Sequence, residues 1–197
     1  MSGLRRSSFR ISLALVAGLT VASSAGHADT RVGGAVFPED LKIGSTSLKL
    51  NGVGVRVFYH LVDGYATGLY VISPSRDEKA LANGPNPKVL YTEFLHDASL
   101  ERVKGEYESI HTHYCKLYAC DAQNEASFAA LTAHLAAAKR GEAQLILVTD
   151  QGVSIQRNGA VVASINDPNF GKGLVQSLLS EAAPTDGFRQ GLLGNAN

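Results

Sequence analysis

Residues 36–72 constrain the fold most, because they indicate several β-strands separated by turns. Along one predicted strand, Val55, Val57, Tyr59 and Leu61 would face one side, and Gly54, Arg56, Phe58 and His60 the other. β-Branched and aromatic residues of this kind favour the middle of a sheet. The permanent charge of Arg56 then needs an anionic partner or a route to water. Arg56 is therefore either a side chain that reaches solvent or an anion anchor at the mouth of an apolar pocket.

Short apolar runs between turn residues predict an antiparallel sheet of roughly seven strands. Besides the Arg56 strand, which is expected to begin after Gly52 and Gly54, they cover residues 41–43, 47–50, 65–72, 88–94, 144–149, 153–157 and 160–165. Turns are expected at Gly44, Asp63-Gly64 and Asn158-Gly159.

Helical periodicity appears in blocks between these strands. Helices are expected at residues 76–82, from Asp97 or Ser99 through Tyr114, at 124–139 with Lys139 and Arg140 in the last turn, from Asp167-Pro168 onward, and from Asp186 to Gly194. Strands and helices segregated in this way predict an α+β fold, with the helices packed on one face of an antiparallel sheet.

The N-terminus has the features of a signal peptide. Arg5, Arg6 and Arg10 precede an apolar run over residues 11–21, and small residues lead to a cleavage site after Ala28. We therefore expect a signal peptide at 1–28, one domain at 29–197, and a mature protein without a membrane span. We expect the mature protein to be located in a bacterial periplasm or to be secreted.

Charge and cysteine content narrow the function classes. The formal net charge at pH 7 is zero and there is no basic stretch, which argues against nucleic-acid binding. Cys115 and Cys120 are spaced as C-x4-C, which is compatible with a disulfide in an oxidising compartment. A redox pair or a metal site is less favoured, because the chain has neither a CxxC motif nor a second cysteine pair.

The histidines do not form an obvious metal or cofactor site. His111 and His113 would share a face on a strand, but on the predicted helix they point about 200° apart. A haem bound by His96, His111, His113 or His134 is a minor alternative, and no c-type attachment motif is present. The sequence therefore predicts no metal and no cofactor.

Motifs across the mature chain resemble the chalcone isomerase-like family. The matching residues are Phe37-Pro38, Leu48, Leu50-Asn51-Gly52, Gly54-Val55-Arg56 and Ala66-Thr67-Gly68-Leu69-Tyr70-Val71. The resemblance implies an open-faced β-sandwich, in which an antiparallel sheet carries helices on one face.

The resemblance does not supply a complete catalytic site. Plant enzymes of this family have a Tyr before the long helix, where this chain has Leu95, and their catalytic Thr is not clearly matched. Tyr65 takes the nearest place, and Thr67 lies two residues on, on the same face. Chalcone cyclisation needs hydroxyl donors that stabilise enolate charge. Because only Arg56 matches cleanly, no catalytic residue is assigned.

Relatives in this family that are not isomerases bind fatty acids. Binding a fatty acid requires fewer placed polar groups than chalcone cyclisation does. The resemblance implies Arg56 with Tyr65 or Tyr70 at the anionic head group, Phe58 and Leu69 in the wall, and Thr67 nearby. With this resemblance, we expect an exported, non-catalytic protein that binds a small apolar ligand with an anionic head, such as a fatty acid. An isomerase (intramolecular lyase) acting on a chalcone- or enone-like substrate, and an envelope scaffold, are the alternatives.

Overall fold

The computed structural model describes residues 29–59 and 61–195, and its centre is a seven-stranded antiparallel sheet. In spatial and sequence order the strands are β3 (Asp40–Ile43), β4 (Thr46–Phe58), β5 (Val62–Val71), β6 (Lys88–Phe94), β7 (Ala143–Thr149), β8 (Gly152–Arg157) and β9 (Ala160–Ile165). A separate two-stranded ribbon consists of β1 (Thr30–Val32) and β2 (Ala35–Phe37). The predicted signal peptide and His60 lie outside the described residues.

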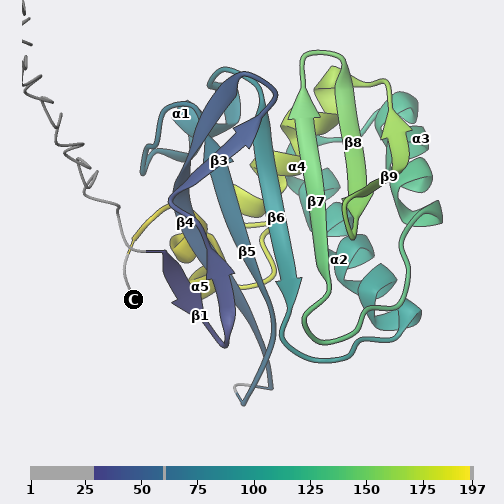
Figure 1. Cartoon of the computed structure of the whole chain (residues 1–197). Helices are drawn as coiled ribbons and strands as arrows, with labels where there is room; N and C mark the ends of the chain where they lie inside the picture. The colour runs from purple at the N-terminus through teal and green to yellow at the C-terminus, as the bar shows by residue number, and fades with distance from the viewer. Residues whose placement is uncertain (1–28, 60, 196–197) are drawn as a thin grey trace, which may run out of the picture.

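Helices cover one face of this sheet. They are α1 (Glu78–Asn83), α2 (Leu100–Tyr118), α3 (Ala122–Ala133), α4 (Pro168–Leu179) and α5 (Asp186–Leu192). Figure 1 shows α2 to α5 behind the curled sheet. The predicted α+β architecture is confirmed. Within the part of the chain that the structure describes, no helix combines the length and the apolar composition needed to cross a membrane.

The core is divided by the sheet. On the helix side, Leu69, Ile146 and Phe170 belong to a large buried cluster that includes α4 and α5. On the other side, residues of the β1–β2 ribbon pack with Leu48, Tyr70 and other strand residues in a second cluster. Strand alternation produces this division, because successive side chains of β5 point to opposite faces.

The tip of the β4–β5 hairpin differs from the sequence prediction. The expected turn at Asp63-Gly64 is wrong: Phe58 already pairs with Val62, and the N–H of Leu61 donates to the carbonyl of Phe58 at 3.0 Å. Asp63 already pairs with Val57 in the ladder. A Cβ at Gly64 would collide with the Phe58 ring, so Gly64 makes room for that ring. The register of β4 on β5 shifts between Arg56 and Val57, β4 ends at Phe58, and Tyr59 takes a positive φ of 53°.

Strand β4 is also longer than predicted. The expected break around Gly52 and Gly54 is absent, and β4 runs through both glycines with a register shift between Leu50 and Gly52. Asn51 lies at this irregularity. Its side-chain amide donates to the carbonyl of Leu192 and accepts from the N–H of Ser75, each at 2.7 Å. The bulged residue therefore ties the end of α5 to the sheet.

Helix α3 ends earlier than the sequence predicted. The prediction that Lys139 and Arg140 form its last turn is wrong, because the helix ends at Ala133. Ala98 and Ala138 instead exchange two backbone hydrogen bonds of 2.9 Å, and Lys139 pairs with Asp97 at 2.8 Å. Tertiary pairing outweighs the helix propensity of the alanine-rich segment.

The predicted disulfide between Cys115 and Cys120 is present. It joins the last turn of α2 to the short connection that leads into α3. The two helices are therefore linked covalently at their junction.

Asp167 provides a pH-dependent contribution to stability. Burial raises the pKa of this carboxyl, but hydrogen bonds, including those from Ser127 at 2.7 Å and the Phe170 N–H at 3.0 Å, lower it more, so the net pKa lies below its usual value. A lowered folded-state pKa stabilises above the unfolded pKa, and this contribution is lost as pH falls through the folded pKa. We expect Asp167→Ala to cost about 2 kcal/mol of unfolding free energy at pH 7, and clearly less near pH 3.

Chemical denaturation at the two pH values measures this difference. Asp77→Ala is the matched control, since Asp77 caps α1 from an exposed position through the N–H of Ala80 at 2.7 Å. It should cost about 1 kcal/mol at pH 7. A cost for Asp167→Ala that is equal at both pH values would contradict the assignment.

Candidate functional site: a cavity between the sheet and the helices

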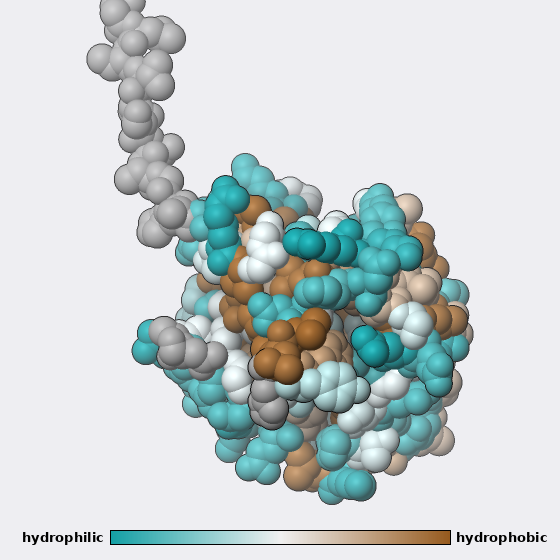
Figure 2. All heavy atoms as spheres, turned by 90° about the horizontal axis from the view of Figure 1, so that it is seen from below, coloured by the Kyte–Doolittle hydropathy of each residue, from teal (hydrophilic) through white to brown (hydrophobic). Residues whose placement is uncertain are grey.

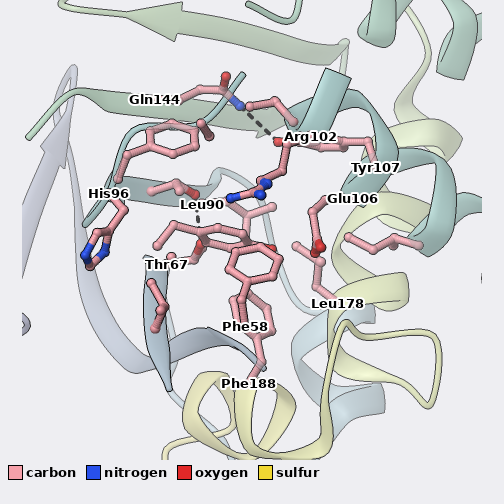
Figure 3. A pocket seen from close by; sticks show the side chains of 18 of the residues that line it. Phe58, Thr67, Leu90, His96, Arg102, Glu106, Tyr107, Gln144, Leu178 and Phe188 are labelled. Atoms are coloured by element: carbon pink, nitrogen blue, oxygen red, sulfur yellow. Dashed lines mark hydrogen bonds between the residues drawn. The ribbon is translucent and has the colours of Figure 1, made fainter. Parts of the chain in front are cut away.

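An apolar cavity of about 130 Å³ lies between the helix-covered face of the sheet and α2, α4 and α5. Strands β4 to β7 contribute its floor (Figure 3). Most of the wall is hydrophobic: Phe58, Val62, Leu90, Phe94, Val103, Ile110, Ile146, Leu174, Leu178 and Phe188. Sites for small organic ligands usually combine such walls with a few placed polar groups.

Arg56 is held behind this wall by Glu106 of α2. Its Nε donates to one carboxylate oxygen of Glu106 at 2.9 Å, and its Nη2 donates to the other at 3.0 Å. Both side chains are 19% exposed. The hydrogen bonds to Glu106 raise the pKa of Arg56 in spite of its burial. The charge of Arg56 is thus balanced within the protein, and Arg56 does not line the cavity.

Among the described residues, Arg102 is the permanently charged cation that lines the cavity. It lies one helical turn before Glu106 on α2, and its guanidinium stands over the Phe58 ring at 5.7 Å, while that of Arg56 stands over the same ring at 4.5 Å. Figure 3 shows the Arg102 side chain extending among the other lining residues. Within residues 29–59 and 61–195, Arg102 forms no ion pair. Its charge is therefore available to an anion in the cavity.

Two tyrosine hydroxyls add neutral donors to the cavity. Tyr107 accepts a hydrogen bond from the side-chain amide of Gln144 at 2.9 Å, which leaves its own proton free to donate. Burial raises the pKa of Tyr107 to about 12 and raises that of Tyr65 well above its usual value. Both hydroxyls therefore stay protonated at neutral pH. The hydroxyl of Thr67, by contrast, already forms a hydrogen bond with the hydroxyl of Thr92 at 2.8 Å.

Acidic Asp97 also lines the cavity, but Lys139 and the backbone N–H of Arg140 bind its carboxylate at 2.8 and 3.0 Å. These hydrogen bonds lower the pKa of Asp97. Asp97 is thus ionised and locally neutralised, so it does not cancel the charge of Arg102.

The end of the molecule near the β4–β5 turn is apolar and exposed. Tyr59 and Leu61 are 83% and 87% exposed, and Tyr59 and Val62 line the cavity. Figure 2, which views the molecule from below, shows hydrophobic surface gathered there within a hydrophilic surround. The hairpin tip therefore borders the mouth of the cavity.

The structure brings together three of the five predicted ligand residues. Phe58, Tyr65 and Thr67 line the cavity, whereas Arg56 lies behind it and Leu69 is buried in the core beneath it. Tyr70, the alternative head-group residue, packs on the opposite face of the sheet.

Sequence reasoning missed Arg102, Glu106 and Tyr107. Their signal was present, because residues 103, 107 and 110 define the apolar face of α2, and positions 102 and 106 flank that face one turn apart.

Comparison with known proteins decides the family. A model described as chalcone isomerase-like matches residues 29–194. The chain belongs to the chalcone isomerase-like family. Among solved structures, the chain resembles the fatty-acid binding protein AtFAP1 of Arabidopsis thaliana with a TM-score of 0.66 and 16% identity, over 85% of this chain and 97% of that one. None of the curated proteins searched matches it significantly.

In this chalcone isomerase-like protein, Leu95 cannot act at the cavity. The resemblance placed a catalytic Tyr of the plant enzymes at this position, but Leu95 is 4% exposed and belongs to the cluster on the opposite face of the sheet. The hydrogen bonds of Arg56 within the described residues go to Glu106 and to the carbonyl of Val57. No hydroxyl group is hydrogen-bonded to Arg56 among these residues.

Proposed function

We propose that this protein binds a small, largely apolar carboxylic acid in the cavity and does not transform it. The observation that carries the proposal is Arg102, a cation without an ion-pair partner among the described residues, at a mostly apolar cavity. The carboxylate head would accept hydrogen bonds from Arg102 and from the tyrosine hydroxyls, while the tail would pack against the hydrophobic wall.

The charge arrangement supports an anionic head. Arg56 and Glu106 balance each other, whereas Arg102, which is exposed at the edge of the cavity, is a positive charge that no described residue pairs. A monoanion would balance it, whereas a neutral ligand would not. Arg56 is then a positioning residue: it fixes Glu106 and the Phe58 ring, against which Arg102 also packs.

The similarity to a fatty-acid binding protein supports the same ligand class. The cavity itself favours a small buried group, because an engineered apolar cavity of about 150 Å³ holds a single benzene ring. The enclosed part of the ligand would then be a ring or a chain of about six to eight carbons.

A chain-length series tests the size of the buried group. We expect affinity to rise from butanoate to octanoate, by a factor of about four for each methylene, and to change less than about threefold from octanoate to hexadecanoate, where further carbons remain in the mouth. Isothermal titration below the micellar concentration measures it. A continued steep rise up to hexadecanoate would show that the protein encloses the whole chain.

We also propose that the protein is exported after cleavage near Ala28. The positive, apolar and small-residue segments of its N-terminus support this. The intact mass of the protein from a periplasmic fraction should correspond to residues 29–197. Recovery of the uncleaved chain from the cytoplasm alone would contradict export.

A further inference from the structure

Four metal-ligating side chains converge at the junction of α2 and α3, apart from the cavity. His111 and Cys115 lie one turn apart on α2, Cys120 lies in the connection, and Glu125 lies in the first turn of α3. Their donor atoms all lie within 4.8 Å of one another. The two cysteines are disulfide-bonded in this structure. We propose that reduction of this disulfide by a dithiol opens a four-ligand site for Zn²⁺.

The separations between donor atoms fit a tetrahedral zinc site. The Sγ of Cys115 lies 3.3 Å from the Nε2 of His111 and 3.8 Å from a carboxylate oxygen of Glu125. His111 Nε2 lies 3.8 Å from the other oxygen of Glu125. Zinc bonds of about 2.0–2.3 Å place tetrahedral ligands about 3.3–3.8 Å apart. His111 and Cys115 therefore already have about the spacing that Zn²⁺ requires. Glu125 approaches each of them through a different oxygen, so its carboxylate must turn to place one oxygen near both.

His111 is held in the orientation that a ligand needs. Its ring stacks on Phe128 with centroids 3.8 Å apart and planes 7° apart, and its side chain is 13% exposed. This packing directs Nε2 toward the sulfur of Cys115 and toward the amide oxygen of Asn124 at 3.3 Å. Zinc binding would therefore leave the ring where it is. Because the Asn124 oxygen accepts a hydrogen bond from Nε2, the Nε2 proton must first move to Nδ1.

The fourth ligand requires the redox step. A dithiol transfers two electrons and two protons to the Cys115–Cys120 bond, which becomes two thiols, and the dithiol is oxidised to its own disulfide. Zn²⁺ then displaces the two thiol protons and binds two thiolates, a neutral imidazole and a carboxylate. The Cα atoms of the cysteines are 5.1 Å apart, and Cys120 lies outside both helices, so side-chain rotation can separate the sulfurs.

This chemistry would keep the two helices joined in both redox states. The disulfide links them in the oxidised chain, and Zn²⁺ would replace it in the reduced chain. The inference is independent of the cavity ligand, because none of the four ligand residues lines the cavity.

Zinc titration of the mature chain tests the proposal. The protein is reduced with dithiothreitol, freed of it under anaerobic conditions, and titrated with Zn²⁺ against a chromophoric chelator, with Co²⁺ as a spectroscopic probe of thiolate ligation. We expect about one tightly bound Zn²⁺ per reduced chain and almost none in the oxidised chain. His111→Gln should weaken binding by at least about tenfold. His113→Gln, on the same helix but outside the cluster, should leave it unchanged.

Two results would overturn the proposal. One is a reduced, folded chain that binds no Zn²⁺ more tightly than about micromolar, the range of weak adventitious binding. The other is a Cys115→Ser/Cys120→Ser double variant that binds Zn²⁺ as tightly as the reduced wild type. If circular dichroism shows that reduction unfolds the α2–α3 junction, Zn²⁺ must restore the helical signal, and failure to do so would equally overturn it.

Discussion

Arg102→Gln should weaken binding of octanoate by about tenfold to thirtyfold, because it removes the unbalanced positive charge at the cavity. A hydrogen bond to a charged group contributes about 1.5–3 kcal/mol, and exposure of Arg102 at the mouth reduces this toward the lower end. Octanol, which has the same chain and no charge, should lose little affinity. Isothermal titration of both ligands against wild type and variant measures the difference.

Arg76→Gln is the matched control for this experiment. Arg76 is exposed, lies outside the cavity, and has no ion pair within the described part of the chain. Its replacement changes net charge equally but should leave octanoate affinity unchanged. If the two variants lost equal affinity for octanoate, the effect would be one of net charge alone. If Arg102→Gln lost equal affinity for octanoate and octanol, Arg102 would act through packing.

Gly54→Ala should destabilise the fold by about 2–4 kcal/mol, the range of an overpacked core. Helix α5 lies directly against the backbone of β4: a Cβ on Gly54 would stand 2.5 Å from the carbonyl oxygen of Phe188. A Cβ on Gly191 would in turn collide with the carbonyl of Val53. Backbone atoms cannot rotate away as a side chain can, so α5 would have to move outward. Since Phe188 is part of the cavity wall, octanoate binding should weaken as well.

Gly105→Ala provides the control for the added methyl group. Gly105 lies within α2, and nothing stands within 4 Å of a Cβ placed there. Replacement of an exposed helical Gly by Ala should stabilise by about 0.5–1 kcal/mol. Urea denaturation of both variants gives the two values. A Gly54→Ala protein as stable as wild type would mean that α5 does not pack closely on β4.

Local patterns were sufficient for much of the fold. The predicted bounds of β6 and β9 agree with the structure, and Asp167-Pro168 opens α4 as expected. Each of these segments is bounded by its own turn or capping residues, so the sequence nearby contains the information. The predicted turn at Asp63-Gly64 was wrong because Gly64 makes room for the Phe58 ring across the hairpin. The sequence does not show whether a glycine is needed for a turn or for a close contact of this kind.

The candidate site was only partly predictable for a related reason. Phe58, Tyr65 and Thr67 follow from strand alternation, which fixes the face on which each side chain lies. Strand alternation does not identify the partner of Arg56, because Glu106 lies 50 residues away on a different element. Only the packing of α2 on the sheet determines that Glu106 binds Arg56 and that Arg102 is left at the cavity.

Native mass spectrometry of the protein purified from its own cells tests the central claim most directly. Wild type and Arg76→Gln should both retain a bound species that, after release, is identified as a small carboxylic acid, and Arg102→Gln should have lost it. A wild-type protein whose cavity retains no acid, and which binds none of the chain-length series in titration, would contradict the account. So would a neutral lipid retained equally by all three proteins.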